Sequence, residues 1–172
     1  QNKKTHRTGF IKQGRTLRNI GIIGYGSMGT MLVEKLSKNK DNRLYVYNRT
    51  IEKLKSLPPE IYICSSNSDL ASKVDIVIMC VRPFDIKLVL SEIAESVRAD
   101  TLIVSLNGSV SFASMEKIIN HKMAKVIPSL TAEIGKSQTL VCFNEKAGED
   151  DKINLESLFK CMGDVILLPE NE

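Results

Sequence analysis

The sequence lacks tryptophan, contains only two histidines, and has aromatic residues at 5% of its 172 positions. So few aromatic side chains provide no stacking platform for single-stranded nucleic acid. His6 lies near the N-terminus and His121 stands beside a predicted strand, so neither a metal cluster nor a Ser-His-Asp triad is expected. No apolar run approaches the roughly 18–20 residues that cross a bilayer, and no secretory signal is recognisable. We therefore expect a soluble protein with no nucleic-acid, metal or membrane partner.

Paired cysteines are also missing. Cys64, Cys80, Cys142 and Cys161 lie far apart in the sequence, and no two of them form a CxxC motif. Three of them lie inside apolar runs, where a free cysteine behaves as a small buried hydrophobic residue. This pattern favours a reducing cytoplasm and argues against a disulfide scaffold or a zinc site.

Acidic residues are absent from positions 1–19. That segment carries a charge of +6, and since the whole chain carries +4, the remaining residues must carry −2. Its cations are Lys3, Lys4, Arg7, Lys12, Arg15 and Arg18. We interpret residues 1–18 as a basic tail that is disordered or was added in cloning. A basic arm that contacts phosphate and an organellar presequence are the alternatives.

From residue 19 onward, short apolar runs alternate with helical periodicity. Strands are predicted over 20–24, 44–47, 61–63, 75–81, 102–106, 124–127, 139–143 and 165–168, and helices over 28–36, 50–57, 86–97, 112–119 and 155–162. Gly163 is expected to cap the last helix, and the acidic residues 149–151 to form its first turn. Strands that alternate with helices favour right-handed crossovers and a mostly parallel sheet covered on both faces. Residues 19–172 are therefore predicted to form one doubly wound α/β domain.

The first predicted strand ends in Gly24-Tyr25-Gly26-Ser27-Met28-Gly29, which has the G-x-G-x-x-G spacing. This spacing alone is a weak signal, but here it closes a buried strand and opens an amphipathic helix, the context that a dinucleotide site requires. Gly24 would allow the tight turn, Gly26 the approach of a pyrophosphate, and Gly29 close packing of helix on strand. We therefore expect a Rossmann-type site with the pyrophosphate at the helix N-terminus.

The residues that follow the second predicted strand indicate which cofactor the site binds. An NAD site usually has Asp or Glu there to bind the ribose 2′-hydroxyl, whereas this chain has Asn48-Arg49-Thr50. A guanidinium attracts a 2′-phosphate that a carboxylate would repel, so NADP(H) is predicted over NAD(H). In the alternative interpretation, Arg49 is only an exposed cation and Thr50 only a helix N-cap.

Two further loops should face the ligand, because they follow the fourth and fifth predicted strands. They are Cys80-Val81-Arg82-Pro83 and Ser105-Leu106-Asn107-Gly108. Arg82 is a candidate neighbour of the pyrophosphate or ribose, with a solvated arginine as the alternative. The Asn-Gly pair is a turn dipeptide that could also contact the nicotinamide. Cys80 is interpreted as a packing residue.

In their order and spacing these motifs resemble the N-terminal domain of pyrroline-5-carboxylate reductase. The resemblance is carried by IGIIGYGSMG, YNRT, DIVIMCVRPFDI, LIVSLNGSVSFASMEKII and KVIPSLTAEIGKSQTLV, spread over residues 19–172. It implies an oxidoreductase of proline biosynthesis in which NADPH reduces the C=N bond of a cyclic imine. The cofactor-binding residues that it implies are Gly24, Tyr25, Gly26, Ser27 and Met28 at the pyrophosphate, Asn48, Arg49 and Thr50 at the 2′-phosphate, and Val81, Arg82, Pro83, Asn107 and Gly108 at the ribose and nicotinamide. No catalytic residue is assigned, since positioning a hydride donor supplies most of the catalysis.

The chain departs from the family pattern at two loops. Members usually have Met-Pro-Asn followed by Thr-Pro where this chain has Ile127-Pro128-Ser129-Leu130-Thr131, and Ala in place of Asn107. The Ile-Pro-Ser variant is similar to a reductase-like branch associated with late competence in Gram-positive bacteria. Both loops approach the nicotinamide and substrate in the family, so these departures concern the substrate and not the binding of the cofactor.

The C-terminal helical domain of the family, which forms the dimer and much of the imine pocket, is absent from this sequence. We therefore expect the cofactor-binding domain of an NADPH-dependent imine reductase whose full-length relatives are homo-oligomers. A non-catalytic NADP-binding regulatory module is one alternative. A related NADP-dependent oxidoreductase with a different substrate is the other.

Overall fold

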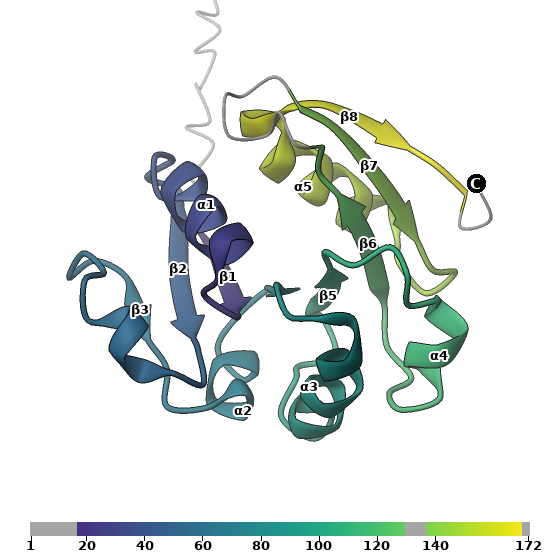
Figure 1. Cartoon of the computed structure of the whole chain (residues 1–172). Coiled ribbons are helices and arrows are strands. Elements are labelled where there is room, and N and C mark those ends of the chain that lie inside the picture. Colours follow the sequence, from purple (N-terminus) through teal and green to yellow (C-terminus); the bar gives the residue numbers. More distant parts are fainter. Residues whose placement is uncertain (1–16, 130–136, 170–172) are drawn as a thin grey trace, which may run out of the picture.

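The computed structural model describes residues 17–129 and 137–169, which form an eight-stranded sheet with helices on both faces (Figure 1). Most of the predicted basic tail, together with Leu130 and Thr131, lies outside these residues. The strands are β1 (Arg18–Ile23), β2 (Asn42–Tyr47), β3 (Tyr62–Ile63), β4 (Ile76–Met79), β5 (Leu102–Ser105), β6 (Met123–Ile127), β7 (Ser137–Phe143) and β8 (Gly163–Leu167). Each overlaps one of the strands predicted from the apolar runs.

The strand order is β3-β2-β1-β4-β5-β6-β7-β8. All neighbouring strands are parallel except β6 and β7, which pair antiparallel. The prediction of a doubly wound, mostly parallel sheet is therefore confirmed. Strands β2 and β3 lie on one side of β1, and β4 lies on the other side. The C-terminal ends of β1 and β4 therefore form a topological switch point, and sheets of this kind bind ligands at such a point.

Two layers of helices cover the sheet. The helices are α1 (Ser27–Leu36), α2 (Asn67–Ala71), α3 (Ile86–Ile93), α4 (Phe112–Glu116) and α5 (Glu149–Phe159), with shorter 3-10 turns η1 (Ile51–Leu54), η2 (Pro83–Asp85) and η4 (Lys160–Met162). Helices α1 and α5 cover one face, and α2, α3 and α4 cover the other (Figure 1). On β4, Ile76 and Ile78 pack under the first layer while Val77 and Met79 pack under the second. Both faces of β4 are therefore buried, which explains why this strand is an unbroken run of apolar residues.

Helix α2 was not predicted, because it is too short to show an apolar stripe. It packs Leu70 and Ala71 into the core and has an N-terminal cap, in which the Ser66 hydroxyl accepts a hydrogen bond from the backbone N–H of Asp69 at 2.9 Å. Asp69 also pairs with Lys73 at 2.8 Å. The Ser-x-x-Asp spacing of Ser66 and Asp69 is a recognised helix-start signal, so this helix could have been found from the sequence.

Two other predicted elements differ in detail. The helix predicted over 50–57 is the four-residue 3-10 turn η1, of which only Leu54 is buried. The last predicted helix ends as expected, with Gly163 at a φ of 126° after η4. Residues 149–151 form the acidic first turn of α5, as predicted. Among the described residues, no helix has the length and apolar character needed to cross a membrane.

Candidate functional site

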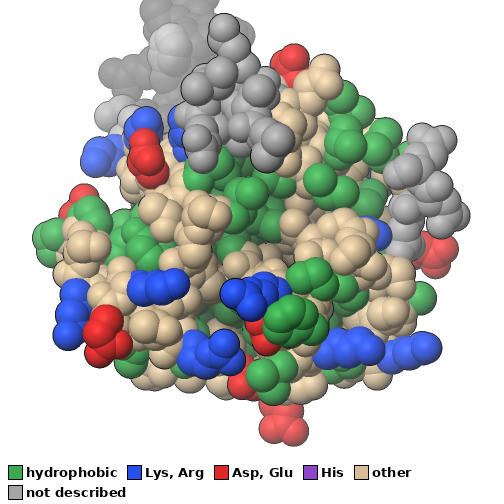
Figure 2. All heavy atoms as spheres, in the orientation of Figure 1, with side chains coloured by type: hydrophobic (Ala, Val, Ile, Leu, Met, Phe, Trp, Pro, Cys, Tyr) green, Lys and Arg blue, Asp and Glu red, His purple; other side chains and the backbone are tan. Residues whose placement is uncertain are grey.

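A pocket of about 680 Å³ opens where the C-terminal ends of β1, β2, β4 and β5 meet. Its walls come from the glycine loop before α1, from the segment after β2, and from η2 and α3. Lys and Arg side chains lie across the lower half of the same face (Figure 2). Of the thirteen residues predicted to bind the cofactor, twelve line this pocket. Gly108 does not line it; instead it packs on Ile127, whose Cδ1 would lie 2.7 Å from a Cβ at Gly108.

The three glycines of the loop have different surroundings. Gly24 has a φ of 96°, and a Cβ there would lie 2.6 Å from the carbonyl oxygen of Cys80. A Cβ on Gly29 would collide with the carbonyl oxygen of Gly24. A Cβ on Gly26 would meet nothing within 4 Å, because Gly26 faces the open pocket. The tight turn at Gly24 and the close packing of helix on strand at Gly29 thus agree with the prediction. Gly26 leaves room for a ligand.

Helix α1 points its N-terminus into the pocket. Gly26 precedes the helix and carries no capping side chain, and no acidic residue lies in the first turn. Ser27 and Met28 of that turn line the cavity. The amide groups and the positive end of the helix dipole therefore face a space suited to an anionic group.

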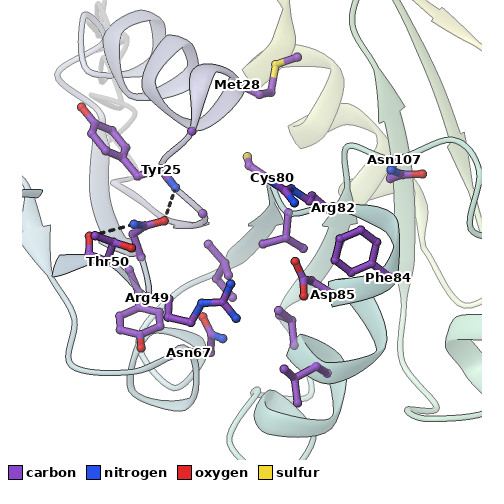
Figure 3. Close-up of a pocket in the computed structure, with 18 of the residues that line it drawn as sticks. Tyr25, Met28, Arg49, Thr50, Asn67, Cys80, Arg82, Phe84, Asp85 and Asn107 are labelled. Carbon is purple, nitrogen blue, oxygen red and sulfur yellow. Dashed lines mark hydrogen bonds between the residues drawn. The ribbon is translucent and has the colours of Figure 1, made fainter. Parts of the chain in front are cut away.

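Asn48 connects the end of β2 to the glycine loop. Its Oδ1 accepts a hydrogen bond from the backbone N–H of Tyr25 at 2.9 Å, and its Nδ2 donates to the carbonyl of Thr50 at 2.9 Å (Figure 3). The side chain that was expected at the 2′-phosphate is thus held by backbone groups on both sides. We assign it a positioning role, which leaves direct contact with an anion chiefly to its neighbours.

Those neighbours are Arg49 and Thr50, both exposed and both lining the pocket. Thr50 precedes η1 but its side chain makes no capping hydrogen bond, so the alternative interpretation of Thr50 as a side-chain N-cap is not supported. Lys53, one turn further along, also lines the pocket. Sequence reasoning missed Lys53, although its spacing of four residues from Arg49 could have indicated a shared face.

The loops after β4 and β5 form the opposite wall. Arg82 places its guanidinium carbon 5.9 Å from the centre of the Phe84 ring. Cys80 also lines the pocket, and burial raises the pKa of its thiol above the ordinary value, which disfavours the reactive thiolate. Asn107 lines the pocket as well, with its Oδ1 accepting hydrogen bonds from the N–H of Ser109 at 2.9 Å and from the Ser109 hydroxyl at 2.6 Å.

Several lining residues were not predicted at all. They include Lys53, Asn67, Phe84, Asp85, Leu88 and Glu92. Apart from Lys53 they come from α2, η2 and α3, whose placement beside the glycine loop depends on the sheet order rather than on any local motif. In the part of the chain that the structure describes, no group of three His, Cys, Asp or Glu side chains is arranged to hold a metal ion.

The strand order, the glycine loop at the switch point and the cationic segment after β2 define a Rossmann-type dinucleotide-binding domain. The profile of the family described as "NADP oxidoreductase coenzyme F420-dependent" matches residues 19–108. The chain belongs to this family.

Two curated relatives illustrate what the chain is similar to. The chain is 31% identical to ComE operon protein 4 of Bacillus subtilis over 147 residues, covering 82% of this chain and 54% of the relative. It is 26% identical to pyrroline-5-carboxylate reductase of Escherichia coli over 160 residues, covering 89% of this chain and 60% of that enzyme. The resemblance to pyrroline-5-carboxylate reductases is therefore confirmed.

Solved structures show the same relationship. A pyrroline-5-carboxylate reductase from Coxiella burnetii superposes with a TM-score of 0.81 at 27% identity, over 89% of this chain and 59% of that one. The Plasmodium falciparum pyrroline carboxylate reductase with NADP bound has the same fold, with a TM-score of 0.78 at 22% identity, covering 89% of this chain and 58% of that one. The chain thus spans little more than half the length of the proteins that it matches.

Proposed function

We propose that this chain is the cofactor-binding domain of an NADPH-dependent reductase that acts on a small cyclic imine of the pyrroline-5-carboxylate type. One observation carries the cofactor assignment: the residues after β2 that line the pocket include Arg49 and Lys53 and no carboxylate. Cations there attract a 2′-phosphate, whereas the acidic residue of an NAD site would repel it.

The residues present fit this cofactor along its length. The open space at Gly26 and the first turn of α1 suit the pyrophosphate, while Arg49, Thr50 and Lys53 suit the 2′-phosphate. Val81, Arg82 and Pro83, which line another wall, would contact the ribose, and Asn107 would lie near the nicotinamide. When bound, NADPH would supply the hydride that reduces the C=N bond. The chain's own contribution is to hold the donor in a fixed position, which is a large part of catalysis in such reactions.

The substrate assignment is supported by those relatives that are named pyrroline-5-carboxylate reductases. A second function is favoured by the loop after β6, where Ser129 replaces the asparagine usual in the family. Because that loop approaches the substrate in the family, the change favours a non-catalytic NADP-binding module or an oxidoreductase with another substrate. Homo-oligomerisation would use a helical domain that lies outside this sequence.

Cofactor binding is tested by titrating the chain with NADPH and with NADH while following the fluorescence of the reduced nicotinamide. We expect NADPH to bind about tenfold more tightly or better, the scale of one charge-assisted contact. Equal affinities would refute the 2′-phosphate site.

The reductase assignment is tested with the polypeptide encoded by the complete reading frame, by following NADPH oxidation on addition of pyrroline-5-carboxylate. Oxidation of NADPH with formation of proline supports the imine reductase. Tight NADPH binding with no turnover would instead support the non-catalytic module.

A further inference from the structure

The turn after β5 holds an amide side chain in one orientation. Asn107, the second residue after β5, is half-buried and lines the pocket. Its Oδ1 accepts hydrogen bonds from the backbone N–H of Ser109 at 2.9 Å and from the Ser109 hydroxyl at 2.6 Å. A backbone N–H can only donate, so the amide atom that it meets must be the oxygen. The nitrogen Nδ2 is therefore the atom turned away from Ser109.

Two contacts also fix the backbone of this turn. The N–H of Asn107 donates to the hydroxyl of Ser105, which is 1% exposed, at 3.2 Å. Gly108 packs on Ile127 so closely that a Cβ would lie 2.7 Å from its Cδ1. The side chain of Asn107 thus projects from a backbone that is already held in place, as is expected of a group preorganised to bind a ligand.

The nitrogen of this amide is a donor without a protein acceptor. Nδ2 carries two hydrogens and makes no hydrogen bond within the part of the chain that the structure describes. In Figure 3 this nitrogen lies on the side of Asn107 that faces Arg82 and Cys80, and the oxygen lies on the far side. The pocket therefore receives a donor that is suited to an oxygen acceptor on a ligand.

The strand order indicates which half of a dinucleotide reaches this donor. Strands β2 and β5 lie on opposite sides of the central pair β1 and β4. With the 2′-phosphate after β2 and the pyrophosphate at α1, the loop after β5 belongs to the nicotinamide half. The carboxamide is the hydrogen-bonding group of the nicotinamide ring, and a contact with its oxygen would fix the plane of the ring.

We propose that Nδ2 of Asn107 donates a hydrogen bond to the carboxamide oxygen of the bound nicotinamide, an inference that rests on the proposed function. The contact orients the ring from which the hydride leaves, and orientation of the reacting groups is a large part of catalysis. Alanine, which is usual at this position in the family, has no side-chain donor. The contact is therefore a feature of this chain and not a property shared by the family.

The test compares three ligands by calorimetric titration. They are NADPH, 2′,5′-ADP, which lacks the nicotinamide half, and the reduced 3-acetylpyridine analogue of NADPH, in which a methyl group replaces the carboxamide nitrogen. Asn107→Ala should weaken NADPH and the analogue about fivefold each, the scale of one hydrogen bond, because both ligands retain the acceptor oxygen. Its affinity for 2′,5′-ADP should stay within twofold of that of the original chain.

Asn107→Asp is the matched variant, since one carboxylate oxygen can still accept both hydrogen bonds from Ser109 while the other replaces the donor. A carboxamide can turn over and donate its own N–H to this oxygen, whereas the methyl ketone of the analogue cannot. We therefore expect the ratio of the two affinities, NADPH over the analogue, to rise about fivefold or more in Asn107→Asp.

The outcomes separate this inference from the proposed function. If Asn107→Ala binds NADPH within twofold of the original chain, or loses 2′,5′-ADP as strongly as NADPH, the nicotinamide contact is overturned while the proposed function stands. An unchanged affinity ratio in Asn107→Asp overturns the contact as well. If the original chain does not bind NADPH at all, both proposals fail together.

Discussion

The side-chain oxygen of Asn48 accepts a hydrogen bond from the backbone N–H of Tyr25 at 2.9 Å. The two residues are 23 positions apart, yet this contact holds the glycine loop against the end of β2. The backbone N–H of Gly24 adds a second link by donating to the carbonyl of Tyr47 at 2.9 Å. The loop that should receive the pyrophosphate and the segment that should receive the 2′-phosphate are thus joined through one amide side chain.

Replacing Asn48 with alanine should therefore impair both folding and cofactor binding. The change removes two hydrogen bonds to backbone groups and should lower the free energy of unfolding by about 1–2 kcal/mol. It should also weaken NADPH binding severalfold, because the glycine loop is no longer held in place. Asn39→Ala is the matched control, since its Oδ1 also accepts a backbone N–H, from Asp41, but outside the pocket. Equal NADPH affinity in the two variants would contradict the positioning role.

The cations after β2 should determine the preference for NADPH. Arg49→Ala should weaken NADPH binding by about 1.5–3 kcal/mol, the scale of a hydrogen bond to a charged group, and leave NADH binding unchanged. Lys53→Ala should act in the same direction but less strongly, because a lysine does not form the paired contact of a guanidinium. Lys55→Ala, at an exposed lysine outside the pocket lining, is the control. If NADH binding falls as much as NADPH binding, these cations do not contact the 2′-phosphate.

Gly26 and Gly29 should respond differently to the same substitution. Gly29→Ala forces a methyl group onto the carbonyl oxygen of Gly24 and should destabilise the fold by about 1–3 kcal/mol. Gly26→Ala meets open space at a φ of −88°, so its effect on unfolding should stay below about 1 kcal/mol. The added methyl group should nevertheless block the ligand and reduce NADPH affinity at least tenfold.

Chemical denaturation and fluorescence titration of the same two variants separate these effects. An unaltered affinity in Gly26→Ala would show that the ligand does not approach this part of the loop.

Acid should weaken the fold partly through Glu116. A hydrogen bond from Asn144, together with one from Lys146, holds the pKa of the Glu116 carboxyl below its usual range. Because the carboxyl is more acidic in the folded chain than in the unfolded one, its stabilisation is complete above the unfolded pKa of about 4.3. It is lost as the pH falls through the folded value.

In urea titrations, Glu116→Gln should therefore be less stable than the original chain at pH 7 and nearer to it at pH 3. Glu95→Gln, at an exposed glutamate, is the control. A constant difference between Glu116→Gln and the original chain across this range would exclude the linkage.

Much of the fold could be predicted because each strand is encoded locally. The β4 run, for example, is buried on both faces, so an unbroken apolar segment is a sufficient signal. The glycine loop could be predicted because its spacing follows a buried strand and opens an amphipathic helix, although the group that a Cβ on Gly24 would meet is the distant carbonyl of Cys80. Helix α2 was missed because only three of its five residues are buried, and its start depends on a cap rather than on periodicity.

The sequence by itself determined the strand pattern, the glycine turn at the end of β1 and the cation after β2. These depend on burial, backbone freedom and charge, which are properties of neighbouring residues. Only the tertiary structure decided that Asn48 holds the glycine loop and that Glu92 accepts a hydrogen bond from Asn67 across 25 positions. These contacts form because the sheet order brings together segments that are far apart in the sequence, and no local sequence pattern encodes which segments will meet.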